Sequence, residues 1–294
     1  MSKEIYFPAF AKINLFLRVK NRREDGYHEV ESIYQTVSLA DDLRFYPQEK
    51  DVEVIINPPI RLQGVEREMV STTIKKVQEY TNFTGGVKVI VNKHIPLESG
   101  LGGGSADAAA TLRALNLLWD LKLTKEELYS LAKEISADVS FLLEGGTVFS
   151  AGTGEHIKER FLTPEMFCLL VLPYFGISTS WAYQQGDLVG WEEISEDRLN
   201  ECIMAIKRNN ADKLGKSLFN SFEKVIFPRY VELASIKQKL LDSGFSGAVL
   251  SGSGSAIVAI TDREDVLFKS IKDFSLLEGY KIYPAHFTPW VPME

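Results

Sequence analysis

Apolar and polar residues alternate along several segments of the chain, most clearly in its first hundred positions. This period-two pattern, together with β-branched residues, is typical of strands. The strands it predicts are Ile5–Phe10, Ile13–Lys20, Val30–Leu39, Val52–Ile56, Val87–Lys93, Phe167–Pro173, Ala248–Leu250 and Ala256–Ile260. Between the second and third of these, the dipeptide Asp25-Gly26 predicts a tight turn.

Helical spacing of apolar residues appears between these strands. Thr124-x-x-Glu127 has the form of a capping box, which marks a helix start. The predicted helices are Met69–Tyr80, Ala106–Leu118, Thr124 to about Ile135, Leu199–Lys207 and Val231–Asp242. Strands precede helices in both halves without a steady strand–helix–strand alternation. This order predicts an α+β fold with two domains, residues 1–160 and 161–294.

A glycine-rich segment at 96–106 joins a predicted strand to a predicted helix. It reads Pro-Leu-Glu-Ser-Gly-Leu-Gly-Gly-Gly-Ser-Ala. Glycines let successive N–H groups turn toward one point, and the helix start adds unpaired N–H groups and partial positive charge. The segment therefore predicts a cradle for an anion, and a phosphate fits best. It lacks the Gly-Lys-Ser/Thr ending of a P-loop and the third glycine of the dinucleotide fingerprint. A flexible surface loop is the alternative.

A second small-residue loop, Ser-Gly-Ser-Gly-Ser at 251–255, also adjoins predicted strands. One cluster of backbone N–H groups holds only part of a triphosphate, so a second loop would complete the pocket. A plain hairpin turn is the alternative interpretation of this loop.

Composition narrows the classes of protein that fit. The chain has 294 residues, of which 45% are hydrophobic and 25% charged, so a normal core is expected. Its net charge of −7 argues against a broad nucleic-acid surface, although a local pocket can still bind a small anion. Two cysteines are too few for a disulfide framework, and the four histidines lack metal-ligand spacing, so no metal site is predicted. The N-terminus lacks a signal-peptide pattern and no apolar run approaches about 20 residues, which predicts a cytoplasmic protein without membrane contact.

Two charged residues lie within apolar segments. Period two places Phe10, Lys12, Asn14 and Phe16 on one strand face, where polar side chains need a partner or a ligand. An edge strand facing water is the alternative. Asp138 precedes an apolar segment that suggests partial burial, and the alternative there is a helix N-cap.

In combination these segments resemble the GHMP superfamily of small-molecule kinases over nearly the whole chain. The motifs that carry the resemblance are Pro-Ala-Phe-Ala-Lys-Ile-Asn-Leu-Phe-Leu (8–17), Asp-Gly-Tyr-His (25–28), Pro-x-x-x-Gly-Leu-Gly-Gly-Gly-Ser-Ala-Asp-Ala-Ala (96–109), Ala-Asp-Val-x-Phe (137–141) and Ser-Gly-Ser-Gly-Ser (251–255). The resemblance implies an N-terminal domain like ribosomal protein S5 domain 2 and a ferredoxin-like C-terminal domain.

The resemblance also implies ATP as phosphoryl donor, accompanied by Mg²⁺. Lys12 and Asp138 match the superfamily's catalytic pair: Asp138 would accept the proton of the substrate hydroxyl, and Lys12 would keep the aspartate ionised and neutralise charge. Ser105 is a hydroxyl near the phosphates, but no protein ligand of the metal is identified. The implied ATP-binding residues are Pro96, Leu97, Glu98, Ser99, Gly100, Leu101, Gly102, Gly103, Gly104, Ser105 and Ala106.

Within the superfamily, Lys-Ile-Asn-Leu followed by Asp-Gly-Tyr-His is most similar to kinases whose acceptor is a methylerythritol carrying a cytidine diphosphate. That resemblance implies phosphorylation of its 2-hydroxyl in the non-mevalonate route to isoprenoids. Tyr27 and Tyr183 would then stack on the cytosine, His28 would read its edge, and Asn14 would meet the methylerythritol end. Thr179 falls in the same substrate site. The alternative for Tyr183 is a core aromatic on a helix face.

Two further readings stay open. Another GHMP kinase, acting on mevalonate, phosphomevalonate, homoserine or a sugar, would not need an aromatic pair for a pyrimidine. A catalytically silent nucleotide-binding regulator would not need both Lys12 and Asp138. Glu98 departs from the glycine-rich start of the superfamily's loop, and its carboxylate is expected to point away from the phosphates. The sequence does not indicate an oligomeric state.

Overall fold

The computed structural model describes residues 4–58, 65–291 and 293. The first three residues of the N-terminal segment considered above lie outside the described part. Within that part, seven strands form the first sheet, with the order β3-β4-β2-β1-β8, and β5 and β6 branch from β2. Their bounds are β1 (Ile5–Arg22), β2 (His28–Gln48), β3 (Val52–Asn57), β4 (Gly86–Asn92), β5 (Thr147–Ala151), β6 (His156–Phe161) and β8 (Phe219–Asn220).

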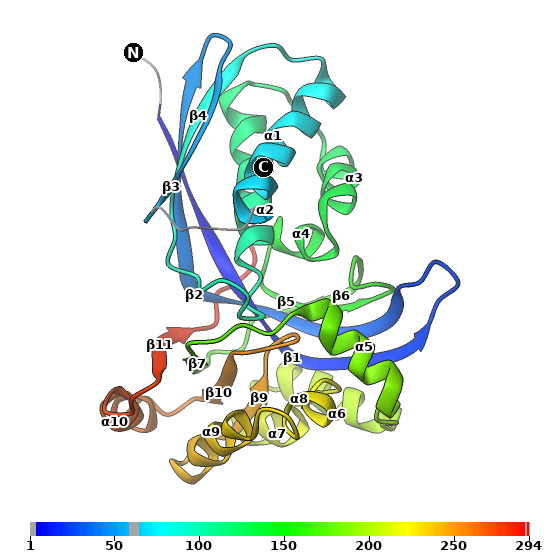
Figure 1. Ribbon diagram of the computed structural model, residues 1–294, viewed down its shortest axis with the longest axis vertical. Helices are drawn as coiled ribbons and strands as arrows, with labels where there is room; N and C mark the ends of the chain where they lie inside the picture. The colour runs from blue at the N-terminus through cyan, green and yellow to red at the C-terminus, as the bar shows by residue number, and fades with distance from the viewer. Residues whose placement is uncertain (1–3, 59–64, 292, 294) are drawn as a thin grey trace.

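Four helices cover one face of the upper part of this sheet (Figure 1): α1 (Val65–Thr81), α2 (Gly103–Leu118), α3 (Lys125–Ile135) and α4 (Ala137–Leu142). Apolar spacing explains why α2 packs here, because Leu112 and Leu115 are fully buried. The capping box at the start of α3 is confirmed, since the Thr124 hydroxyl accepts the N–H of Glu127 and the Glu127 carboxylate accepts that of Thr124.

The structure corrects the prediction of two separate strands before the first turn. Residues Ile5–Arg22 form the single strand β1, which pairs with β2 through register shifts between Phe10 and Lys12 and between Asn14 and Phe16. Such irregularities interrupt strict alternation, so the predicted common face of Phe10, Lys12, Asn14 and Phe16 does not run unbroken. The alternative of an edge strand whose polar face meets water is also wrong, because Lys12 and Asn14 are only 5% and 1% exposed.

The second sheet has four antiparallel strands in the order β11-β7-β10-β9, which is the ferredoxin-like arrangement expected from the resemblance. Helices α9 and α10 pack against it. The strands are β7 (Phe167–Pro173), β9 (Gly247–Leu250), β10 (Ile257–Thr261) and β11 (Tyr280–His286). The helices of this half are α5 (Thr179–Val189), α6 (Glu196–Lys207), α7 (Ala211–Ser217), α8 (Glu223–Ile226), α9 (Val231–Asp242) and α10 (Glu264–Ser275).

The chain passes from the first sheet to the second between Phe161 and Phe167, and a domain boundary after residue 160 stays our proposal. Two later segments return to the first sheet. Strand β8 pairs with β1, and the N–H of Thr288 donates to the carbonyl of Thr36 at 2.9 Å. These contacts join the two halves of the chain.

Within the described residues, no helix is both long and apolar enough to cross a membrane.

Candidate active site between the two halves

A cavity of about 750 Å³ lies where the glycine-rich segment, the β1–β2 pair and the second half of the chain meet. This volume falls within the usual range for small-molecule sites. Its walls come from β1, β2, the start of α2, α4, α5 and the loop at 252–253. The cavity therefore gathers segments that are far apart in the sequence.

Gly102 shapes the wall beside β1. Its φ of 70° is left-handed, and a Cβ there would lie 2.9 Å from Cγ of Lys12. In the same turn, the Lys12 N–H donates to the Leu101 carbonyl at 2.9 Å. Only glycine fits this close approach, so the segment is held in place rather than being a free surface loop.

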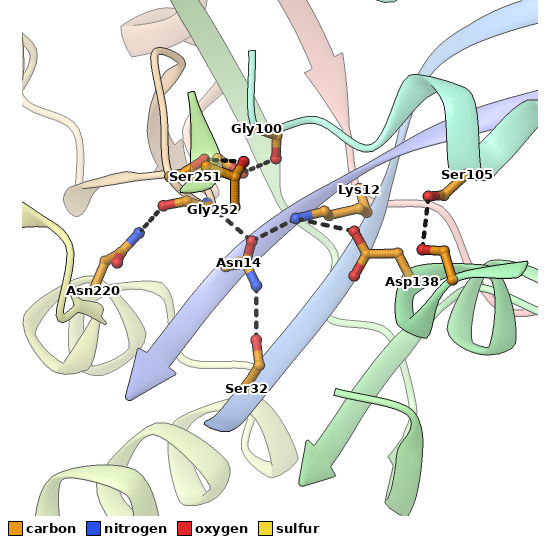
Figure 2. Close-up of polar contacts among 12 residues, drawn as sticks. Lys12, Asn14, Ser32, Gly100, Ser105, Asp138, Asn220, Ser251 and Gly252 are labelled. Atoms are coloured by element: carbon orange, nitrogen blue, oxygen red, sulfur yellow. Dashed lines mark hydrogen bonds and ion pairs between the residues drawn. The ribbon is translucent and has the colours of Figure 1, made fainter. Parts of the chain in front are cut away.

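The two small-residue loops predicted from the sequence meet directly. The Ser251 hydroxyl donates to the Gly100 carbonyl at 3.1 Å (Figure 2). The N–H of Ala256 donates to the Ser99 carbonyl at 3.0 Å. A Cβ on Gly100 would lie 2.0 Å from the main-chain carbonyl oxygen of Ser251. The loop at 251–255 connects the antiparallel strands β9 and β10, so it is a hairpin turn, and its residues Gly252 and Ser253 are also part of the cavity wall.

Helix α2 begins within the glycine-rich segment, at Gly103 rather than at the predicted Ala106. Its N-cap, Gly102, has no side chain to satisfy the first N–H groups, and the first turn carries no acidic residue. The positive end of the helix dipole is thus open to an anion in the cavity. The Ser105 hydroxyl, in the first turn of α2, lies 3.3 Å from that of Ser136.

Lys12 is the central charge of the cavity. Figure 2 shows its ammonium group between Asn14 and Asp138: Nζ donates to Asn14 Oδ1 at 2.9 Å and lies 3.7 Å from Asp138 Oδ2. The Lys12 side chain is 7% exposed and that of Asp138 is 27% exposed. The cation is therefore nearly desolvated, while the carboxylate still opens to the cavity.

Asn14 is held by three groups. Its Nδ2 donates to the Ser32 hydroxyl at 2.7 Å, which donates in turn to the Phe16 carbonyl at 2.9 Å. Its Oδ1 also accepts the N–H of Gly252 at 3.0 Å. This chain of bonds fixes the amide orientation and, through it, the position of the Lys12 ammonium.

Asp138 lies in the first turn of α4, and Ser136 occupies the N-cap position instead. The alternative interpretation of Asp138 as an N-cap is therefore wrong. One turn of helix directs its carboxylate toward Lys12, as Figure 2 shows.

A buried cluster of three charged side chains anchors the glycine-rich segment. Lys93 Nζ lies 2.6 Å from Asp41 Oδ2 and 2.8 Å from Asp107 Oδ2, and all three side chains are at most 2% exposed. Asp41 also accepts the N–H of Ile95 at 2.8 Å. Because Asp107 belongs to α2 and Lys93 directly follows β4, the cluster ties both ends of the segment to the sheet.

The far end of the cavity is aromatic. Tyr183 and Thr179 of α5 line it, and the Thr179 hydroxyl lies 2.8 Å from that of Ser253. The Tyr183 ring stacks on the imidazole of His28, with centroids 4.9 Å apart and an 18° interplanar angle. His28 Nε2 lies 2.6 Å from Asp187 Oδ1, and this pair joins β2 to α5.

The predicted residues do not all reach the cavity. Tyr27 is 68% exposed at the tip of the β1–β2 hairpin, to the right in Figure 1, and neither it nor His28 lines the cavity. Leu101 and Ala106 pack into the core: Leu101 precedes α2, and Ala106 lies on the buried face of that helix. The predicted residues that line the cavity are Lys12, Asn14, Pro96, Leu97, Glu98, Ser99, Gly100, Gly102, Gly103, Gly104, Ser105, Asp138, Thr179 and Tyr183.

Glu98 is exposed and has a φ of 48°. Its carboxylate lies against Gly176, where a Cβ would come within 2.7 Å of Oε2. The side chain thus follows the segment between β7 and α5.

Gly252 and Ser253 line the cavity as part of the second loop that was predicted to complete the pocket. Several other lining residues were not predicted, namely Leu17, Val30, Tyr34, Met69, Ser136, Thr153 and Phe222. Tyr34 is the most informative of these because it is a buried polar residue on the strand opposite Asn14. A tyrosine in an apolar strand gives no signal that distinguishes a site from a core.

Comparison with known proteins agrees with this geometry. The model of the GHMP kinases N-terminal domain matches residues 68–146, and that of the GHMP kinases C-terminal domain matches residues 202–269. A crystal structure of 4-(cytidine 5'-diphospho)-2C-methyl-D-erythritol kinase superposes with a TM-score of 0.77 at 26% identity, covering 96% of this chain and 99% of that one. Homoserine kinase from Cytophaga hutchinsonii shares the fold, with a TM-score of 0.73 at 20% identity over 99% of this chain and 96% of that one.

Sequence relatives extend over nearly the full length of the chain. The 4-diphosphocytidyl-2-C-methyl-D-erythritol kinase of Thermoanaerobacter pseudethanolicus is 39% identical over 281 residues, 96% of each chain. The protein of the same name from Enterococcus faecalis is 35% identical over 92% of this chain and 96% of its own. The resemblance seen in the motifs is therefore confirmed: the chain belongs to the GHMP kinases and, among them, to the 4-diphosphocytidyl-2-C-methyl-D-erythritol kinase family.

Proposed function

We propose that the protein transfers the γ-phosphoryl group of ATP to the 2-hydroxyl of 4-diphosphocytidyl-2-C-methyl-D-erythritol. The observation that carries this proposal is the Lys12–Asp138 pair, 3.7 Å apart, beside the open N-terminus of α2 in one cavity. Phosphoryl transfer depends mainly on positioning and neutralisation of charge, and this arrangement supplies both. The non-mevalonate route to isoprenoids, in the cytoplasm, is the context we propose for it.

Asp138 acts as the general base in this proposal. It accepts the proton of the acceptor hydroxyl while the oxygen attacks the γ-phosphorus and the bond to the β-phosphate oxygen breaks. Lys12 orients the carboxylate and offsets negative charge on the moving phosphoryl group. General-base assistance is worth roughly 10²- to 10⁴-fold in rate, so most of the acceleration comes from the phosphate cradle.

The glycine-rich segment holds the ATP phosphates through backbone N–H groups and the helix N-terminus. Oxygen ligands suit Mg²⁺, which keeps several waters and binds mainly through substrate phosphates. The Ser105 hydroxyl, at the start of α2 in the cavity wall, fits as the protein group nearest such an ion. When bound, the ion would neutralise charge on the β- and γ-phosphates.

Tyr183, Thr179 and the residues around them form the acceptor end. We propose that cytosine stacks on Tyr183 and that Tyr27 folds over its other face from the hairpin tip. His28 stacks on Tyr183 and does not line the cavity, so to read the base edge, the role we propose for it, its side chain must move when the substrate binds. Asn14 meets the methylerythritol hydroxyls near Lys12.

An ADP-release assay with a panel of acceptors tests the proposal. The purified protein is given MgATP with the cytidine diphosphate methylerythritol, mevalonate, homoserine or galactose. We expect turnover with the cytidine substrate at least 100-fold above that with the other three. Preference for another acceptor would assign a different GHMP activity, and no turnover with any acceptor would support a silent nucleotide-binding protein.

A further inference from the structure

Tyr34 lies in the middle of the candidate active site although no motif includes it. It is on β2, paired across the strands with Asn14, and lines the cavity with an overall exposure of only 4%. Its ring stacks on Phe141 of α4, with centroids 5.0 Å apart and an interplanar angle of 19°. Phe141 is one helical turn after Asp138, so this packing sets the position of α4 and its carboxylate relative to the sheet.

The hydroxyl end of Tyr34 is also constrained. A Cβ on Gly154 would lie 2.6 Å from the Tyr34 oxygen, and Gly154 has a φ of 110°. Glycine at that position therefore leaves space for a hydroxyl group. The Lys12 ammonium lies 5.6 Å from the centre of the Tyr34 ring, so the same cation faces both the ring and the Asp138 carboxylate.

We infer that Tyr34 is a positioning residue for phosphoryl transfer, whose hydroxyl donates a hydrogen bond to Asp138 and holds that carboxylate toward the acceptor hydroxyl. The inference rests on the proposed function, in which Asp138 is the general base. Lys12 restrains the carboxylate from β1 and Tyr34 restrains it from β2. A carboxylate has about four acceptor positions, so both contacts leave room for the substrate hydroxyl.

Tyr34 does not exchange its own proton in this scheme. Burial, and then the negative charge of Asp138, raise the pKa of Tyr34 well above its usual value. The phenol consequently stays protonated at neutral pH and remains a donor. The proton removed from the acceptor goes to Asp138, and no bond of Tyr34 forms or breaks other than the hydrogen bond.

The first test is Tyr34→Phe, which keeps the ring and its packing on Phe141 but removes the hydroxyl. We expect kcat to fall about tenfold, while KM for ATP changes less than twofold. Tyr129→Phe is the matched control, because the Tyr129 hydroxyl also donates to a carboxylate, Glu144 at 2.8 Å, outside the cavity. Its kcat should stay within twofold of the wild type. An unchanged kcat in Tyr34→Phe would overturn the inference, as would a rise in KM for ATP without a fall in kcat.

The second test is a double-mutant cycle read by thermal unfolding, which does not depend on activity. The shifts in Tm of Tyr34→Phe and Asp138→Asn should be non-additive when combined, since the two side chains interact. The shifts of Tyr34→Phe and Tyr129→Phe should add. Additive shifts in the first cycle would refute a direct interaction. If Asp138→Asn retained normal turnover, the assignment of Asp138 as general base would be wrong. If Asp138→Asn were inactive but Tyr34→Phe turned over normally, only the role of Tyr34 would be refuted.

Discussion

The ammonium group of Lys12 lies 3.7 Å from Oδ2 of Asp138, although the two residues are far apart in the sequence and belong to different elements. Lys12 lines the cavity from strand β1, and Asp138 lines it from the short helix α4. Burying a lysine this deeply is unfavourable unless other groups compensate its charge. Asn14 and Asp138 supply that compensation.

Asp138→Asn and Lys12→Ala should each reduce ATP-dependent phosphorylation by at least about 100-fold, because one removes the proposed proton acceptor and the other removes the cation proposed to hold it. ADP release measures turnover, and circular dichroism checks that the variants fold. Lys88→Ala is the control: this lysine forms a 3.0 Å ion pair with Glu53 at the sheet surface and should be dispensable. Near-normal turnover in either site variant would contradict the mechanism.

Gly102→Ala should raise KM for ATP by about tenfold or more, because the new Cβ would meet the Lys12 side chain at 2.9 Å. Gly279→Ala isolates the backbone effect. Gly279 has a φ of 88° but has nothing within 4 Å of a Cβ, so this variant carries only the cost of a left-handed alanine, about 1–2 kcal/mol. Both variants should lose thermal stability, but only Gly102→Ala should lose affinity for ATP. Equal ATP affinity in the two would show that the close approach to Lys12 is unimportant.

Tyr183→Ala should raise KM for the cytidine substrate by roughly 5- to 150-fold, the range expected for one aromatic stacking partner, with little change in KM for ATP. Tyr174→Ala, which removes a tyrosine that is 69% exposed, should change neither constant. A parallel rise in both KM values for Tyr183→Ala would indicate general damage to the fold instead of a lost base contact.

Tyr27→Ala separates a binding role from a structural one. Tyr27 is 68% exposed without ligand, so its removal should leave the Tm unchanged. If the hairpin tip closes over cytosine, KM for the cytidine substrate should nevertheless rise several-fold, as steady-state kinetics would detect. An unchanged KM would remove Tyr27 from the acceptor site.

The two thiols should be unreactive in the native protein. Cys168 and Cys202 are fully buried, and burial raises the pKa of Cys168 and raises that of Cys202 to about 12. A raised pKa keeps each thiol protonated at pH 8, and the thiolate is the reactive form. A thiol reagent such as DTNB should therefore label neither cysteine until denaturant unfolds the chain, when both should react. Rapid labelling of the native protein would contradict the burial of Cys202 in α6 and of Cys168 in β7.

Local patterns in the sequence determined much of the fold. Period-two alternation and helical spacing located most elements, and the capping box at Thr124 is confirmed, because these signals depend on neighbours a few residues apart. The glycine-rich segment could be recognised for the same reason, since only glycine permits its backbone geometry. The start of α2 at Gly103 was missed because the last glycines of the segment already belong to the helix.

Tertiary structure alone decided which of these residues share a cavity. The register shifts in β1, the contact between Gly100 and Ser251 and the approach of Asp138 to Lys12 all depend on pairing between distant segments. Tyr34 enters the site, and Leu101 turns away from it, for the same reason. The sequence by itself determined which chemical groups were present and the local conformation of the chain around them. Long-range strand pairing and packing determined where those groups point, because side-chain direction follows from register and burial, which no local pattern encodes.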